Sequence, residues 1–203
     1  MMILALSTSS EIASAAVLQN GCLIAEDRAD STQKHAVTTI PLIQDLLVKH
    51  GITLDQIDVF AVDIGPVSFT GIRIGICTIN AFAFAFKKPV IPVTSLRVLA
   101  QPHLEKESRV CALIDAGHDS VYTALYENGT CVHEPSIQVT TTLLAELMPD
   151  TMIVQGEVPI AANVALAAWQ LREKTETVAS PLYVQPSQAE RLYQERNGAL
   201  DHV

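Results

Sequence analysis

The residues most typical of a zinc site in this chain are its six histidines and four cysteines. Zinc sites usually draw such ligands from closely spaced pairs, but the chain has no HxxxH, HExxH or CxxC pair. We therefore predict no metal site and no disulfide framework, and we interpret the cysteines as free thiols in a reducing cytoplasm. The histidines are His35, His50, His103, His118, His133 and His202, and the cysteines are Cys22, Cys77, Cys111 and Cys131.

Acid–base or nucleophilic chemistry has few candidates. Asp63 and Asp115 are the best placed carboxylates, because each lies at or beside the end of a predicted strand, where it can face a cleft. The alternative for both is that they cap loops. No GxSxG motif occurs, and no serine or cysteine has a histidine and an acid in a recognisable order. The sequence does not predict nucleophilic catalysis.

A segment rich in glycine, the 65–75 segment, lies between a predicted strand and a predicted helix. Gly65 permits unusual backbone angles, and either Ser68 or Thr70 can cap the helix. Gly71 and Gly75 are four positions apart, so one helix face lacks side chains and another backbone can approach it closely. A capped corner and a phosphate site both fit, but no lysine follows the glycines as in a Walker A loop. The segment reads Gly65-Pro66-Val67-Ser68-Phe69-Thr70-Gly71-Ile72-Arg73-Ile74-Gly75.

The composition is that of a well-packed acidic protein. The 203 residues are 49% hydrophobic and carry a formal net charge of −9. Such a chain should not grip nucleic acid by itself, so any RNA target requires another subunit with a positive surface. Residues 72–86 are too short and too polar to span a bilayer, and the apolar start fits a first strand better than a signal peptide.

Hydrophobic patterning predicts an α/β fold whose first half runs strand-strand-strand-helix-strand-helix-strand. Asn20-Gly21 between the first hairpin strands favours a type I′ turn, because both positions need positive φ. Pro41 inside the first helix leaves open a kink or a later start. This order is the ribonuclease H-like lobe of the actin-like (ASKHA) proteins. The predicted strands are residues 3–7, 13–19, 22–28, 57–64 and 90–93, and the predicted helices are residues 35–50 and 70–86.

The second half predicts a smaller, reduced α/β lobe. The polar stretch around residues 100–109 marks the boundary, so we predict a lobe over residues 1–102 and another over 103–203. The predicted strands of the second lobe are residues 110–114, 121–126, 130–132 and 152–154, and its predicted helices are residues 142–148 and 161–171.

The two helices of the first lobe carry more apolar side chains than one sheet can cover. The helix over residues 70–86 is apolar nearly all round, and the first helix has two apolar stripes. We therefore predict a partner surface, with burial inside this chain as the alternative. The predicted surface contains His35, Ile40, Ile43, Leu47, Ile72, Ile76, Ile79 and Phe82.

The 65–75 segment closely resembles the GPGSFTGLRIG signature of the TsaB (YeaZ) family. Other segments resemble the family in the same order along nearly the whole chain. They are residues 4–8 (LALST), His35 with residues 40–43 (IPLI), residues 91–96 (IPVTSL), residues 113–116 (LIDA) with residues 121–122 (VY), and residues 181–185 (PLYVQ).

The resemblance implies a non-catalytic subunit of the bacterial machinery that makes threonylcarbamoyladenosine in tRNA. It implies binding to a TsaD-like catalytic subunit through the two helices, a TsaE-like ATPase in the assembly, and a homodimer when alone. It further implies a cytoplasmic protein that meets tRNA only through the complex.

Two departures from the family concern the cleft between the lobes, where we expect Ser7 and Asp115 to lie. The family usually has Asp in place of Ser7 and Gly in place of Val67. Ser7 cannot supply a negative charge for a metal, and Val67 adds a side chain where a phosphate would need bare backbone. We therefore expect no cofactor and no nucleotide hydrolysis.

Two enzymatic alternatives stay open from the sequence, an ASKHA-type small-molecule kinase and a glycoprotease-like metallopeptidase. A kinase would need an acidic residue on the first strand and a glycine-rich adenosine loop in the second lobe. A TsaD-like metal site would need histidines at the positions of Ser95 and Leu99. Neither set of residues is present, and the chain is predicted not to be an enzyme.

Overall fold

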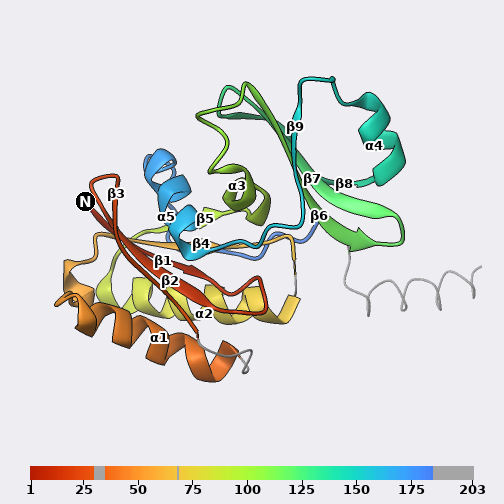
Figure 1. The fold of residues 1–203 in the computed structure, drawn as a ribbon. Helices are drawn as coiled ribbons and strands as arrows, with labels where there is room; N and C mark the ends of the chain where they lie inside the picture. The colour runs from red at the N-terminus through yellow and green to blue at the C-terminus, as the bar shows by residue number, and fades with distance from the viewer. Residues whose placement is uncertain (30–34, 68, 185–203) are drawn as a thin grey trace, which may run out of the picture.

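Two β-sheets, each covered by helices, make up the part of the chain that the structure describes (Figure 1). The structure is a computed structural model, and it describes residues 1–29, 35–67 and 69–184. Short helix α3 (Ser95–Ala100) follows the last strand of the first sheet and packs on the second. The predicted α/β class is confirmed.

The first sheet has the strand order β3-β2-β1-β4-β5. Its first three strands are antiparallel, whereas β4 and β5 run parallel to β1. This is the ribonuclease H-like arrangement that the sequence predicts. The strands are β1 (Met2–Ser7), β2 (Ser14–Gln19), β3 (Cys22–Arg28), β4 (Val59–Asp63) and β5 (Val90–Val93).

The turn between β2 and β3 has the backbone that its sequence predicts. Asn20 has φ 48° and Gly21 has φ 84°, both in the left-handed region of a type I′ turn. Gly21 also lies against Trp169, because a Cβ at this position would be 2.9 Å from Nε1 of the indole. The turn therefore needs glycine for its backbone angle and for its packing.

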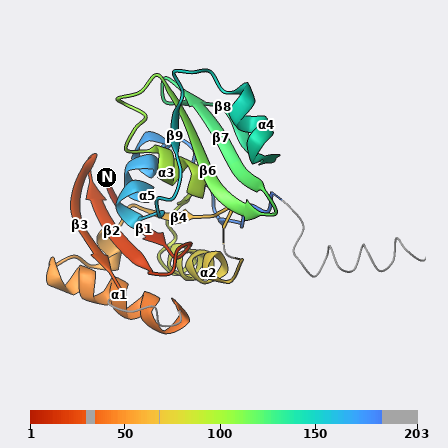
Figure 2. The same cartoon turned by 45° about the vertical axis from the view of Figure 1, so that its right-hand side comes forward.

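Helices cover both faces of the first sheet (Figures 1 and 2). Helices α1 (His35–Lys49) and α2 (Phe69–Phe86) pack on one face, where Phe60, Ile43 and Ile79 share a core. Helix α5 (Ala161–Gln170) packs its small side chains on the other face. Helix α1 already includes His35 and continues through Pro41, so a late start is excluded. A 3₁₀ turn, η1 (Leu54–Gln56), leads from α1 to β4.

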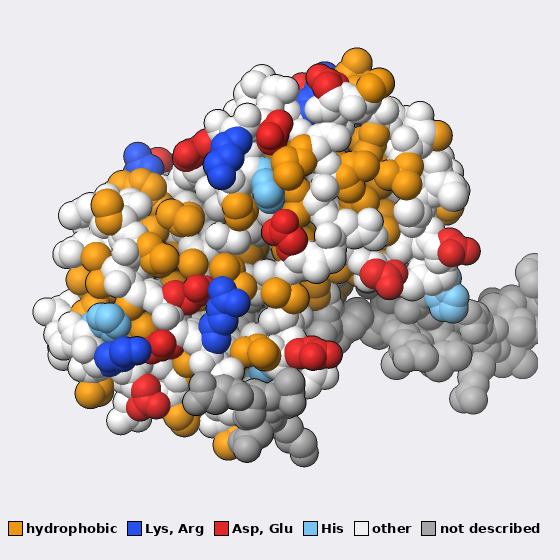
Figure 3. Space-filling view, in the orientation of Figure 1, with side chains coloured by type: hydrophobic (Ala, Val, Ile, Leu, Met, Phe, Trp, Pro, Cys, Tyr) orange, Lys and Arg blue, Asp and Glu red, His pale blue; other side chains and the backbone are white. Residues whose placement is uncertain are grey.

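The second sheet has the order β8-β7-β6-β9. Helix α3 packs on one face and α4 (Thr140–Glu146) on the other. Near α4, apolar atoms remain visible over this sheet (Figure 3). Strand β8 runs well past the three residues predicted, and α3 was not predicted. The strands are β6 (Arg109–Gly117), β7 (Ser120–Glu127), β8 (Thr130–Val139) and β9 (Met152–Val154).

Segments from the second half of the chain return to the first sheet. Helix α5 completes its core, and Glu176 forms a β-bridge with Val90 at its edge. The predicted division into lobes over residues 1–102 and 103–203 stays a prediction. No helix among the described residues combines the length and hydrophobicity needed to cross a membrane.

Candidate functional site

The two glycines on the face of α2 let the β1–β2 loop lie directly on that helix. Thr8 Oγ1 donates a hydrogen bond of 2.7 Å to the carbonyl oxygen of Gly71. A Cβ at Gly71 would collide with the backbone oxygen of Thr8, and a Cβ at Gly75 would collide with its hydroxyl. The predicted close approach of a second backbone is confirmed, and we call these three residues the glycine junction.

His35 belongs to the same region, at the start of α1. Its Nε2 donates a hydrogen bond of 2.8 Å to the carbonyl oxygen of Ser10, in the β1–β2 loop. Its ring also lies 3.5 Å from the Cβ that Gly71 would carry. His35 was predicted to face a partner, but its side chain is half-buried and holds the loop beside α2.

The residues before α2 form the predicted tight turn. Gly65 has φ 94°, and a Cβ there would lie 2.7 Å from Cδ1 of Ile72. Its amide donates to Asp63 Oδ1 at 3.0 Å, and its carbonyl accepts from the amide of Ser95 at 2.8 Å. Pro66 is buried and Thr70 is exposed. The predicted caps cannot all be placed, because Ser68 and the Phe69 side chain lie outside the described residues.

A buried carboxylate joins the ends of β1 and β4 to the start of α3. Asp63 accepts hydrogen bonds of 2.5 Å from both Ser9 Oγ and Ser95 Oγ, and a weaker one of 3.3 Å from Ser7 Oγ. Burial raises the pKa of Asp63, and the bonds from Ser9, Ser95, Gly65 and Ser7 oppose that rise. We call Asp63, Ser7, Ser9 and Ser95 the Asp63 cluster.

Ser7 and Asp115, both predicted to lie in a cleft, have different surroundings. Ser7 is fully buried, and its hydroxyl also lies 3.2 Å from the carbonyl oxygen of Pro159. Asp115 is exposed at the end of β6 and accepts a hydrogen bond of 2.8 Å from the amide of Gly117. Asp115 thus caps its own loop, as the alternative interpretation had it, and the cleft assignment of the two stays a prediction.

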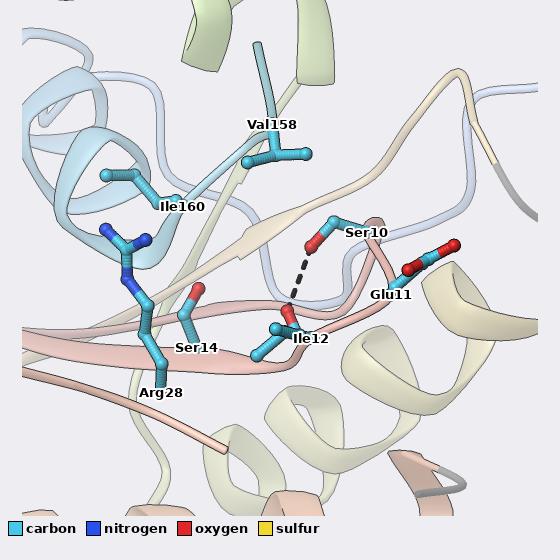
Figure 4. A pocket seen from close by; sticks show the side chains of 7 residues that line it. All are labelled: Ser10, Glu11, Ile12, Ser14, Arg28, Val158 and Ile160. Atoms are coloured by element: carbon cyan, nitrogen blue, oxygen red, sulfur yellow. Dashed lines mark hydrogen bonds between the residues drawn. The ribbon is translucent and has the colours of Figure 1, made fainter. Parts of the chain in front are cut away.

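A small pocket of about 200 Å³ does lie beside the β1–β2 loop (Figure 4). Neither Ser7 nor Asp115 lines it. The nearby N-terminus of α5 is occupied by this chain's own side chains, because Ala161 N donates to Ser14 Oγ and Ala162 N donates to Glu26 Oε1. A carboxylate already at the helix N-terminus disfavours a phosphate there. The pocket is lined by Ser10, Glu11, Ile12, Ser14, Arg28, Val158 and Ile160.

Arg73 ties the end of the described chain to α2. Its Nε donates a hydrogen bond of 2.9 Å to Tyr183 Oη, and its guanidinium lies over the Tyr183 ring. About two turns further along α2, Asn80 makes two hydrogen bonds of 2.9 Å with the backbone of Ala179. Residues 179–183 therefore run along α2. No pattern in the sequence predicted the contact between Asn80 and Ala179.

Most side chains of the predicted partner surface point into this chain. Five of them are buried in the core between α1, α2 and the first sheet. For these five residues, the prediction that they face outward is wrong. They are Ile43, Leu47, Ile72, Ile76 and Ile79. Phe82 is half-buried with its ring 6.0 Å from that of Phe60. Ile40 is 56% exposed, and its use by a partner stays a prediction.

Other large apolar side chains are exposed on the outer sides of α1 and α2. Val37 is 64% exposed, Val48 73% and Phe84 88%. Together with Ile40, we call these residues the helix face. A groove of about 310 Å³ crosses from Ile40 and Val48 to Phe82. It offers space for an apolar side chain from outside the chain.

The glycine junction predicts different rescue behaviour for its two glycines. Gly71→Ala and Gly75→Ala should each lower the free energy of unfolding by about 1–3 kcal/mol, because the new methyl group meets Thr8. Adding Thr8→Ala removes the hydroxyl and should rescue Gly75→Ala. It should not rescue Gly71→Ala, because there the obstacle is the backbone oxygen.

Urea unfolding of the singles and doubles measures these effects, with exposed Ala81→Ser on α2 as the control. Equal rescue of both glycine variants by Thr8→Ala would contradict the geometry.

The Asp63 cluster predicts a pH dependence of stability. The raised pKa means that the folded state holds the Asp63 proton more tightly than the unfolded state does. Relative to Asp63→Asn, the natural chain should therefore lose stability as pH rises above 3.8, until Asp63 is ionised in the folded state. The loss should reach at most about 1.4 kcal/mol per pH unit.

Denaturant unfolding of both proteins between roughly pH 4 and pH 8 tests this difference. A difference that grew in favour of the natural chain with rising pH would exclude the expected shift.

Comparison with known proteins places the chain in a family. A family model described as TsaD, tRNA N6-adenosine threonylcarbamoyltransferase, matches residues 29–171. The tRNA threonylcarbamoyladenosine biosynthesis protein TsaB of Escherichia coli K12 is 37% identical over 134 residues, which are 64% of this chain and 58% of that protein. TsaB of Bacillus subtilis 168 is 29% identical over 180 residues, 88% of this chain and 69% of that protein.

A solved structure agrees. The crystal structure of an uncharacterized Pseudomonas aeruginosa protein with similarity to peptidase YEAZ superposes with a TM-score of 0.76 at 29% identity. The superposition covers 91% of this chain and 99% of that one. The match to the E. coli protein, by contrast, spans little more than half of that protein's length. By the family model, these relatives and this structure, the chain belongs to the TsaB (YeaZ) family, a branch of the wider TsaD-type family.

Proposed function

We propose that this chain is a non-catalytic subunit of the machinery that makes threonylcarbamoyladenosine in tRNA, and that it acts by docking to a TsaD-like catalytic subunit. The names of the TsaB relatives and the TsaD family model support the pathway. The observation that carries the docking is the helix face, because each of its four large apolar side chains on α1 and α2 is more than half exposed.

The helix face is suited to another pair of helices. Phe84 and Val48 are large apolar side chains that no other part of the described chain covers. The groove between Ile40 and Phe82 can accept a partner side chain at the centre of the contact. The same surface serves a second copy of the chain when the catalytic subunit is absent, and a TsaE-like ATPase joins the assembly.

The residues that could have done chemistry are instead used for packing. Ser95 and Leu99, which occupy the positions of the TsaD-like metal ligands, bind Asp63 and fill the second core respectively. Asp63 is fully buried and Asp115 caps a loop. Among residues 1–29, 35–67 and 69–184, no cluster of three His, Cys, Asp or Glu side chains could hold a metal.

The tRNA meets this chain through the complex. A net charge of −9 repels a polyanion, so the positive surface must come from a partner subunit. The contribution of this chain is then to shape or stabilise the catalytic subunit through apolar contact.

Charges placed on the helix face test the docking. Ile40→Glu and Phe84→Glu should each raise the dissociation constant for the TsaD-like subunit of the same organism by about tenfold or more, because a carboxylate is buried without a partner. Folding should change by less than about 0.5 kcal/mol, because both positions are exposed. Calorimetric titration and size exclusion with the purified subunit measure the binding.

Leu144→Glu is the matched control, because Leu144 is an exposed apolar residue on α4, outside the helix face. Binding that is unchanged by both helix-face variants, or equally weakened by the control, would exclude this surface. Ile79→Glu is unsuitable as a binding test, because Ile79 is fully buried and its charge would unfold the core. ATP turnover by the chain alone would favour the kinase alternative, and chelator-sensitive proteolysis the peptidase.

A further inference from the structure

A second and larger cavity lies where the β7–β8 hairpin meets the C-terminal end of α5 and the start of α3. Its volume is about 490 Å³, within the range of small-molecule sites. It shares no lining residue with the pocket of Figure 4 or with the groove of the helix face. Its polar lining includes Thr94, Arg97, Tyr126, Cys131, Glu134 and Lys174.

The side chain of Arg97, which lines this cavity, is held in place by three contacts. Its NH1 group donates to the carbonyl oxygen of Gly129 at 2.7 Å, and its NH2 group donates to Gln170 Oε1 at 2.5 Å. The guanidinium also lies over the Tyr126 ring, 5.4 Å from its centre. Three segments far apart in the sequence thus hold this cation in one orientation before any ligand arrives. Such preorganisation lowers the cost of binding.

The Arg97 charge is not balanced inside the described chain. Its contacts are a carbonyl, an amide oxygen and an aromatic ring, and it forms no ion pair with any described residue. Burial lowers the pKa of Arg97, which is the sign of a cation short of solvation. Its buried Nε has no hydrogen-bond partner among the described residues. A half-buried cation of this kind is stabilised by an anion.

Neither the thiol nor the phenol beside Arg97 supplies a negative charge to balance it. Burial raises the pKa of Cys131 and of Tyr126, so both stay neutral near pH 7. Lys174 brings a second cation near Cys131, and Glu134 is the one carboxylate among the lining residues. Two cations against one carboxylate leave a positive balance, in a chain whose net charge is −9.

We propose that this cavity binds a small organic anion, whose carboxylate or phosphate group lies against Arg97 and Lys174. A planar guanidinium with free N–H groups suits either kind of oxyanion. The remaining wall, from Pro92, Pro135 and Leu171, is apolar and takes the carbon body of the ligand. This site is independent of the helix face and of the docking proposed above.

Nuclear magnetic resonance of the full-length isotope-labelled chain tests the site. Succinate and inorganic phosphate are titrated separately at constant ionic strength, with sodium chloride as the ionic control. We expect saturable shifts of the amides in residues 129–134 and 170–174 at concentrations below roughly 50 mM. The tighter of the two probes identifies the preferred oxyanion. Shifts that do not saturate, that occur elsewhere, or that chloride reproduces would overturn the proposal.

Variants assign the binding to the named charges. Lys174→Ala and Arg97→Gln should weaken binding about tenfold or more, and Glu134→Gln should strengthen it by removing the opposing charge. Arg97 also holds the hairpin, so if Arg97→Gln fails to fold, the exposed Lys174 and Glu134 decide the matter. An unchanged affinity in both of these variants would also overturn the proposal.

Discussion

The close approach of Thr8 to α2 is the contact on which the rest of the first lobe depends. Helix α2 can lie under the β1–β2 loop only because Gly71 and Gly75 have no side chains. This close contact sets the distance between α2 and the β1–β2 loop. His35, at the start of α1, contacts the same loop through its hydrogen bond to Ser10. The outer sides of both helices, and hence the helix face, are positioned by this one steric constraint. The 65–75 segment is rich in glycine like a phosphate-binding loop, but its glycines Gly71 and Gly75 serve the packing of α2 against the β1–β2 loop.

The Asp63 cluster shows a second use of polar residues in place of catalysis. A carboxylate with no exposed surface cannot meet a substrate, but it can gather donors from three chain segments. Ser7, at the end of β1, donates to this carboxylate from the adjacent strand instead of carrying a charge of its own. Burial of the charge costs stability, and the hydrogen bonds recover part of it. These hydrogen bonds fix the relative positions of β1, β4 and α3 where the three elements meet.

The sequence predicted backbone features well and the direction of side chains less well. Asn20-Gly21 and the glycines of α2 have conformations or contacts that few other residues allow, so their roles could be read directly. Helix periodicity could not tell where the buried side of α1 ends, because Ile40 and Ile43 are equally apolar members of one predicted stripe, yet Ile43 is buried and Ile40 is 56% exposed. Helix α3 has six residues, too few for a periodic signal. The cavity around Arg97 joins segments more than seventy residues apart, which no local pattern reveals.

The structure separates two tasks that the chain could have combined. The 65–75 segment and the Asp63 cluster fix the fold, and the four polar side chains of the cluster are buried. The exposed sides of α1 and α2 carry apolar surface whose burial yields binding energy that scales with area. On the proposed function, an acidic chain gains from this arrangement, because apolar docking is insensitive to the salt and charge conditions that govern RNA binding. The chain can then hold its partner without competing for the polyanion that the partner binds.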